Sequence, residues 1–209
     1  MPTPTRSPVP MRLAQAAALA ACLLAAGTAG AQAPSAGPST APATAPADAA
    51  CPATLQHTFP RLQDEKPQSL CQYSGKVVLV VNTASFCGFT PQYKGLEALD
   101  SKYRSRGLVV LGFPSNDFSQ ESGSNKEIAD FCESTFGVKF PMFAKSSVRG
   151  PNANPLFKQL ALASGTTPKW NFYKYLIGRD GKVVESYSSM TSPDDRAFVR
   201  DLEKQLGPQ

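Results

Sequence analysis

The sequence predicts an α/β fold in which helices flank a central mixed β-sheet. Two unbroken apolar runs rich in β-branched residues, 77–81 and 108–113, are typical of strands buried on both faces. A helical pattern lies between them, so the three segments form a βαβ unit with a right-handed crossover. Residues 171–187 add an antiparallel hairpin, because two strand-like segments flank an Asp-Gly turn.

The first 33 residues have the pattern of an export signal. Arg6 and Arg12 precede an apolar segment at 13–26, and residues 31–33 have the small-x-small form that a signal peptidase accepts. The apolar run is short for a membrane span. We therefore expect residues 1–33 to be a signal peptide and the protein to be exported to the bacterial periplasm.

Two alternatives within this signal stay open. Met11 begins a conventional signal by itself, so either Met1 or Met11 is the true start. Residues 19–22 resemble a lipobox, in which Cys22 would be lipidated and would anchor the protein to a membrane. Simple cleavage is favoured, because the apolar core continues past Cys22.

The next segment, 34–50, consists almost entirely of Ala, Pro, Ser and Thr. It has too little large apolar surface to offset the entropy lost on ordering, so we expect a disordered linker. The remaining residues, 51–209, have the length of one domain.

Composition disfavours two kinds of partner. The formal net charge is +5, and the charges are scattered without basic runs or basic-aromatic interleaving, so no nucleic-acid surface is expected. His57 is the only histidine, and no close cysteine-carboxylate cluster accompanies it. We expect His57 to be structural, with no metal and no cofactor bound.

Four cysteines lie in the predicted domain, since Cys22 belongs to the signal. An even number in an oxidising compartment invites disulfides, and four cysteines allow three connectivities. We favour a bond between Cys51 and Cys71, because both precede the first core strand. This disulfide would stabilise an N-terminal arm that has few apolar residues to form a core of its own.

Cys87 is the candidate reactive group. It follows the first buried strand in a loop of small residues, and Pro91 and the helical pattern at 92–103 come next. The unpaired amides of a helix N-terminus favour the thiolate, which is the nucleophilic form of cysteine. The alternative is that Cys87 is a small buried hydrophobic residue.

Further elements follow in order. After the strand at 108–114, Ser124 and Glu127 form a predicted capping box, which starts a helix that carries Cys132. Residues 139–144 predict a short edge strand, in which a proline limits pairing.

Two more helices are predicted, one before the hairpin in sequence, at 152–164, and one after it, at about 192–206. The complete order is βαβα, a short strand, a helix, a hairpin and a last helix, which is thioredoxin-like topology. A site where a strand meets a helix is usual for that architecture. Thioredoxins and exported thiol-disulfide reductases use Cys-x-x-Cys, whereas residues 87–90 are Cys-Gly-Phe-Thr. This disfavours a general disulfide oxidoreductase.

Three motifs occur in order along the domain: Asn-Thr-Ala-Ser-Phe-Cys-Gly-Phe-Thr at 82–90, Phe-Pro-Ser-Asn-Asp-Phe-Ser-Gln-Glu at 113–121 and Trp-Asn-Phe-Tyr-Lys-Tyr-Leu-Ile at 170–177. Together they resemble the glutathione peroxidase family in its cysteine-containing, two-cysteine form. The resemblance implies a thiol peroxidase that reduces hydrogen peroxide or organic hydroperoxides.

The resemblance also implies a catalytic set. Cys87 would attack the peroxide, beside Gln120, Trp170 and Asn171. Two amides and an indole N–H can donate to an anionic sulfur and then to the departing oxygen, so no histidine is required.

The same resemblance assigns the resolving role to Cys132. Oxidised Cys87 would be a sulfenic acid, which condenses with a nearby thiol to a disulfide. Members with a matching second cysteine use a thioredoxin-like reductant more than glutathione, so we expect that donor. Because Cys132 is predicted on a helix, the first turns of that helix must unwind before the two sulfurs meet.

The chain departs from the family pattern at three points. Ser115 and Asp117 stand where the family often has cysteine and glutamine, and the loop to Gln120 is one residue shorter. The extra loop that tetrameric members carry before the third motif is absent, so we expect a monomer. A peroxide sensor that passes its oxidation to a client protein is the alternative function.

Overall fold

The computed structural model describes residues 51–121 and 123–208. The predicted signal peptide, the possible lipidation site at Cys22 and the predicted linker lie outside the described residues.

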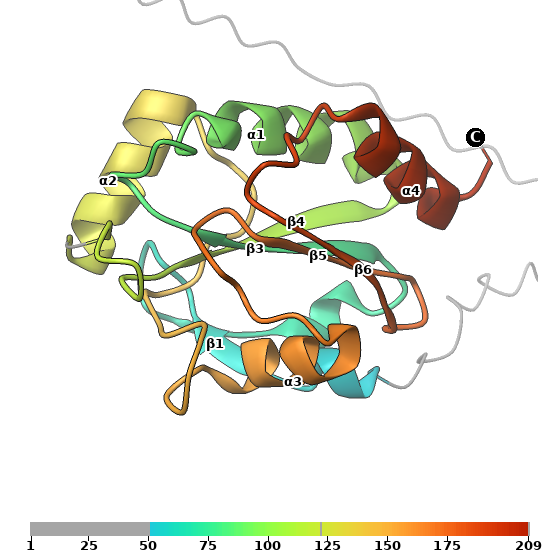
Figure 1. Cartoon of the computed structure of the whole chain (residues 1–209), viewed down its shortest axis with the longest axis horizontal. Helices are drawn as coiled ribbons and strands as arrows, with labels where there is room; N and C mark the ends of the chain where they lie inside the picture. Colours follow the sequence, from blue (N-terminus) through green and yellow to red (C-terminus); the bar gives the residue numbers. More distant parts are fainter. Residues whose placement is uncertain (1–50, 122, 209) are drawn as a thin grey trace, which may run out of the picture. The chain divides into compact units, whose positions relative to one another are not determined.

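A four-stranded mixed sheet forms the centre of the fold, in the order β4-β3-β5-β6 (Figure 1). β3 (Val77–Thr83) pairs in parallel with β4 (Leu108–Pro114). On its other side β3 pairs antiparallel with β5 (Lys174–Ile177), which forms the hairpin with β6 (Val183–Tyr187). The predicted α/β class, parallel pair and hairpin are confirmed.

Helices cover both faces of this sheet, which explains why β3 is apolar at every position from 77 to 81. Figure 1 shows α1 (Gln92–Tyr103) and α4 (Arg196–Leu206) above the sheet, and α3 (Pro155–Ser164) below it. The side chains of β3 alternate between two buried clusters, one with α1 and α4 and the other with α3. The sheet therefore separates two cores.

Capping residues fix where the helices begin. The predicted capping box is confirmed: Ser124 and Glu127 bond reciprocally at the start of α2 (Asn125–Phe136). α3 begins at Pro155, with Asn154 as the N-cap, and α4 begins at Arg196. The last two helices are therefore shorter at their N-terminal ends than predicted, because polar caps and a proline start them later.

The predicted edge strand at 139–144 was wrong. This segment forms only isolated bridges, from Met142 to Gly112 of β4 and from Phe143 to Arg61. Pro141 has no N–H for a continuous ladder, and Met142 packs so closely over Gly112 that a Cβ there would clash. The segment covers the edge of β4 without extending the sheet.

Three further features belong to the N-terminal arm. β1 (Thr58–Pro60) and β2 (Pro67–Ser69) form a small antiparallel hairpin that the sequence did not predict. The structure contains a disulfide between Cys51 and Cys71, whose Cα atoms are 5.2 Å apart. His57, in the same arm, shares a hydrogen bond of 2.9 Å with Gln159 of α3, which fits a structural residue.

Within the described residues, no helix has both the length and the apolar character needed to cross a membrane.

We expect the Cys51–Cys71 bond to stabilise the domain, because it restricts the unfolded chain. The variant Cys51→Ser/Cys71→Ser should lower the free energy of unfolding by about 2–4 kcal/mol, measured by urea denaturation. Both proteins should carry Cys87→Ser and Cys132→Ser, so that no thiol exchange occurs. Equal denaturation midpoints would contradict this expectation.

Candidate active site

Cys87 lies in a tightly bonded loop between β3 and α1. Thr90 Oγ1 accepts a hydrogen bond of 3.0 Å from the Cys87 N–H and donates one of 2.9 Å to the Ala84 carbonyl. The Phe89 N–H donates to Cys87 Sγ over 3.4 Å. The side chain is 7% exposed. The loop therefore directs a backbone amide at the Cys87 sulfur, which suits a reactive cysteine.

Gln120 lies against this loop and is paired with Asn171. The Phe86 N–H donates to the Gln120 carbonyl over 3.1 Å. Asn171 Nδ2 donates to Gln120 Oε1 over 2.9 Å. Because the side-chain oxygen of Gln120 is engaged in this way, its amide hydrogens are left to serve another acceptor.

The loop before Gln120, which is one residue shorter than in the family pattern, reaches Asn171 because one of its residues has a left-handed conformation. Ser119 has φ 57°, a conformation that few non-glycine residues adopt. Asp117 also anchors the loop, because its Oδ2 accepts hydrogen bonds from the backbone N–H groups of Val148 and Arg149, at 2.7 and 3.1 Å. Although the loop is one residue shorter than in the family pattern, Gln120 therefore still contacts Asn171.

The third motif is held by the end of β3. Asn82 Nδ2 donates to the Trp170 carbonyl over 3.1 Å, and the Asn82 carbonyl accepts from the Phe172 N–H. Phe172 has φ 64°, so the chain turns sharply here and β5 begins only at Lys174, later than predicted. Trp170 is 41% exposed, and its ring packs against Phe118, with ring centroids 5.4 Å apart.

A buried lysine supports this turn, and sequence reasoning missed it. Lys174 is fully buried, and its Nζ donates to the Phe172 carbonyl and to Gln92 Oε1, at 2.8 and 2.7 Å. Gln92 Nε2 in turn donates to the Ser189 carbonyl, while Ser189 Oγ donates to the Asn171 carbonyl. Burial lowers the pKa of Lys174 to about 7. The alternation of side chains along a strand could have indicated this burial, because it places Lys174 on the same face as Leu176, in the core.

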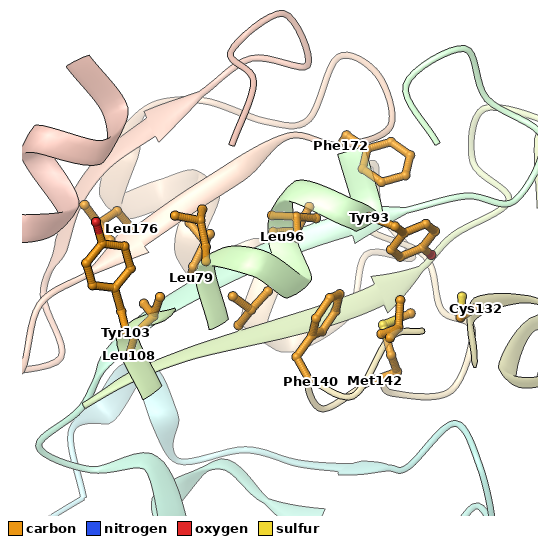
Figure 2. Packing of buried hydrophobic residues seen from close by; sticks show 14 of the residues in the cluster. Leu79, Tyr93, Leu96, Tyr103, Leu108, Cys132, Phe140, Met142, Phe172 and Leu176 are labelled. Carbon is orange, nitrogen blue, oxygen red and sulfur yellow. The ribbon is translucent and has the colours of Figure 1, made fainter. Parts of the chain in front are cut away.

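Cys132 lies on α2, as predicted, and is buried in the same core cluster as Cys87. Figure 2 shows the Tyr93 hydroxyl directed toward Cys132. Burial raises the pKa of the Cys132 thiol to about 11. A second buried group that the sequence did not single out is Glu121, which accepts a hydrogen bond of 3.0 Å from Ser85 Oγ.

The structure thus brings the three motifs together. Gln120 and Asn171 are in direct contact, and Gln120 is bonded to the loop that carries Cys87. Trp170 is tied in through its backbone and through Phe118, with its indole at the surface.

Comparisons with known proteins agree with this arrangement. Residues 56–161 match a family model described as glutathione peroxidase. The chain is 51% identical over 154 residues to the hydroperoxy fatty acid reductase gpx1 of Synechocystis sp., covering 68% of this chain and 90% of the relative. It is 52% identical over 155 residues to the glutathione peroxidase-like peroxiredoxin gpx1 of Schizosaccharomyces pombe, covering 70% of this chain and 95% of the relative.

Solved structures give the same result. The crystal structure of GPX1 from T. cruzi superposes with a TM-score of 0.59 and 32% identity, covering 74% of this chain and 96% of that chain. A thioredoxin family thiol:disulfide interchange protein from Chlorobium tepidum has a TM-score of 0.57 and 19% identity, covering 77% of this chain and 100% of that chain. The second likeness confirms the thioredoxin-like fold.

The burial of Lys174 predicts a pH-dependent stability difference. Between about pH 7 and the ordinary lysine pKa of 10.5, the unfolded chain binds a proton that the folded chain has lost. Stability conferred by the neutral amine therefore rises with pH across this window and is lost as the pH falls toward 7. Below pH 7 both states are protonated, and the difference is constant.

We expect the free energy of unfolding of the wild type, relative to Lys174→Met, to increase by up to about 1.4 kcal/mol per pH unit in this window. Urea denaturation of both proteins from pH 6 to 10 measures the difference, and other titrating groups cancel. A difference that is independent of pH would show that the buried lysine keeps its ordinary pKa.

Proposed function

This chain belongs to the glutathione peroxidase family, and we propose that it is a thiol peroxidase that reduces hydrogen peroxide or organic hydroperoxides through Cys87. The observation that carries the proposal is the Asn171–Gln120 hydrogen bond, which lies against the Cys87 loop and leaves amide hydrogens of Gln120 for the reaction. In the family, residues of these types surround the peroxidatic atom.

The peroxidatic step follows from these donors. The Cys87 thiolate attacks one peroxide oxygen, the O–O bond breaks, and the other oxygen leaves as hydroxide or alkoxide and takes up a proton. Cys87 becomes a sulfenic acid. Gln120 and Asn171, with the Trp170 indole, would stabilise the negative charge as it moves from sulfur to the departing oxygen.

A fatty acid hydroperoxide is a suitable organic substrate. The Synechocystis relative is named for such a substrate. Phe86, the residue before Cys87, is 68% exposed, and the Trp170 ring is also partly exposed. An exposed aromatic side chain next to the reactive cysteine suits a substrate with an apolar chain.

We propose that Cys132 resolves the sulfenic acid and that a thioredoxin-like protein restores both thiols, with glutathione as the alternative reductant. Cys132 lies within α2 and is buried, so the helix must open before the two sulfurs can bond. Without a resolving thiol, the sulfenic acid would be open to further oxidation.

The two-cysteine cycle predicts different defects for two variants of the purified full chain. Cys87→Ser should abolish both reaction with peroxide and oxidation of reduced thioredoxin. Cys132→Ser should still react once with peroxide, but should lose at least 99% of thioredoxin-coupled turnover, because no disulfide forms. The turnover assay follows peroxide-dependent oxidation of reduced thioredoxin.

Normal turnover by Cys132→Ser would remove the resolving role. If the wild type oxidises at Cys87 without sustained turnover, the sensor function is supported instead.

We further propose that the protein is exported as a monomer, with cleavage after residue 33. The signal pattern at 1–33 and the Cys51–Cys71 disulfide, which is typical of oxidising compartments, support export. The monomer is supported by the lack of the extra loop that tetrameric members of the family carry before the third motif.

Expression of the full gene in a bacterium should yield a periplasmic protein whose mature N-terminus, by mass spectrometry, is Pro34. A diacylated Cys22 at the N-terminus would establish the lipoprotein instead. An unprocessed cytosolic chain would contradict both forms of export.

A further inference from the structure

Lys174 occupies a position at which the fold favours an apolar side chain. It is the first residue of β5, is 0% exposed and lies on the same face as Leu176, which belongs to the core cluster with α1 and α4. It forms no ion pair among the residues that the structure describes. Burying an amine without a carboxylate partner is costly. A residue that carries such a cost is a candidate for a role in the site.

The Lys174 amine closes a ring of hydrogen bonds around the turn at Asn171 and Phe172. Its Nζ donates to the Phe172 carbonyl over 2.8 Å and to Gln92 Oε1 over 2.7 Å. Gln92 Nε2 donates to the Ser189 carbonyl over 2.7 Å, and Ser189 Oγ donates to the Asn171 carbonyl over 2.6 Å. Both the ammonium and the neutral amine have the two hydrogens that this ring requires, so the ring forms in either protonation state.

The ring is anchored to the loop that carries the reactive cysteine. Gln92 is the first residue of α1, and its N–H donates to the Phe89 carbonyl over 2.9 Å. The Phe89 N–H donates in turn to Cys87 Sγ over 3.4 Å. A continuous path of hydrogen bonds and peptide units therefore leads from the Lys174 amine to the Cys87 sulfur.

The opposite side of the ring holds the side-chain amides of the site. Asn171 Nδ2 donates to Gln120 Oε1 over 2.9 Å. The next residue, Phe172, has φ 64°, which is an unfavourable conformation for a bulky residue and persists only where its surroundings impose it. The Phe172 N–H is held by the Asn82 carbonyl, and its own carbonyl is held by Lys174. Lys174 therefore helps to maintain the turn that directs the Asn171 side chain at Gln120.

We propose that Lys174 is a positioning residue of the peroxidatic step, an inference that rests on the peroxidase function proposed above. Lys174 does not touch the peroxide. It fixes the Asn171 amide, and through it Gln120, relative to the first turn of α1 and the Cys87 sulfur. Donors stabilise a departing oxygen only when they are already in place, so a small displacement of this pair is enough to slow the reaction.

A double-mutant cycle separates this role from a purely structural one. Lys174→Met keeps a side chain of similar length but removes both hydrogen bonds from the amine. Asn171→Ala removes the amide that donates to Gln120 and leaves the backbone carbonyl of residue 171, and hence the ring, intact. If Lys174 acts through the Asn171 side chain, its substitution has little left to disturb in Asn171→Ala. A general loss of structure would slow both backgrounds by the same factor.

The test is a single-turnover reaction of the full chain, with Cys87 and Cys132 reduced, and one equivalent of hydrogen peroxide. Acid-quenched samples analysed by mass spectrometry give the rate of Cys87 oxidation. Alkylation of Cys87 by iodoacetamide is measured in parallel, because that reaction uses the same sulfur but no oxygen departs. Circular dichroism establishes that each variant is folded.

In Lys174→Met, oxidation of Cys87 should slow by about 100-fold, the effect expected when reacting groups are displaced by about 1 Å. Alkylation should slow by less than tenfold. In the Asn171→Ala background, the same substitution should slow oxidation by less than tenfold.

Ser189 provides an independent pair of variants in the same ring. Ser189→Ala removes the donor to the Asn171 carbonyl and should slow Cys87 oxidation by at least tenfold. Ser189→Thr keeps a hydroxyl and should stay within threefold of the wild type. Tyr103→Phe is the matched control, because it removes a hydrogen bond of 2.6 Å to Glu203 from a buried residue at the other end of α1. Its rate should equal that of the wild type.

The proposal is overturned if Lys174→Met slows oxidation by less than tenfold, slows alkylation as much as oxidation, or has the same effect in both backgrounds. Should Lys174→Met fail to fold, the Ser189 pair decides the matter, since a Ser189→Thr rate no higher than that of Ser189→Ala contradicts the positioning role. A wild type that does not oxidise at Cys87 removes the peroxidase function itself, whereas a reactive wild type with unaffected variants removes this inference alone.

Discussion

The hydrogen bonds of Asn82 at the end of β3 are the constraint on which the site depends. The same residue holds three residues of the third motif: its side chain donates to the Trp170 carbonyl, and its backbone bonds with Phe172 and Tyr173. β3 runs directly into the Cys87 loop, and Asn82 lies opposite Phe113 of β4, the strand that leads to Gln120. One buried amide residue therefore fixes the position at which three distant segments meet.

The site also places ionisable groups where the core would favour apolar ones. Lys174 and Glu121 are both fully buried, and neither forms an ion pair with the other in the part of the chain that the structure describes. Each is held by neutral partners, with Lys174 bonded to carbonyl oxygens and Glu121 to Ser85. Such arrangements reduce stability, and they are typical of sites where function has constrained the sequence.

Features with a strong local pattern could be predicted from the sequence. The buried β-branched runs gave β3 and β4, the capping box gave the start of α2, and the Asp-Gly turn gave the β5-β6 hairpin. The failures have a common cause, which is that tertiary contacts decided the outcome. Residues 139–144 look like a strand, but Met142 packs over Gly112 and stops the ladder, and the short β1-β2 pair carries too little pattern to be recognised.

The candidate site was only partly predictable for the same reason. Its motif residues could be placed by resemblance, but the Gln120–Asn171 bond depends on the left-handed conformations of Ser119 and Phe172, which no local preference indicates. The burial of Glu121 and Lys174 depends on how loops and strands meet. By contrast, the Cys51–Cys71 pair could be favoured from the expected oxidising compartment and from the position of both cysteines before the first core strand, and the structure contains this bond.

The sheet separates two pairs of cysteines with opposite requirements. Cys51 packs against the core on the α3 side, whereas Cys87 and Cys132 belong to the core on the α1 side. In the proposed cycle, a reductant that restores the Cys87 and Cys132 thiols must leave the Cys51–Cys71 bond intact. Because the two pairs lie on opposite sides of a continuous sheet, a protein docked at one cannot readily exchange thiols with the other. In the proposed cycle, a reductant bound on the α1 side would therefore act on Cys87 and Cys132 while the sheet separates it from the Cys51–Cys71 bond.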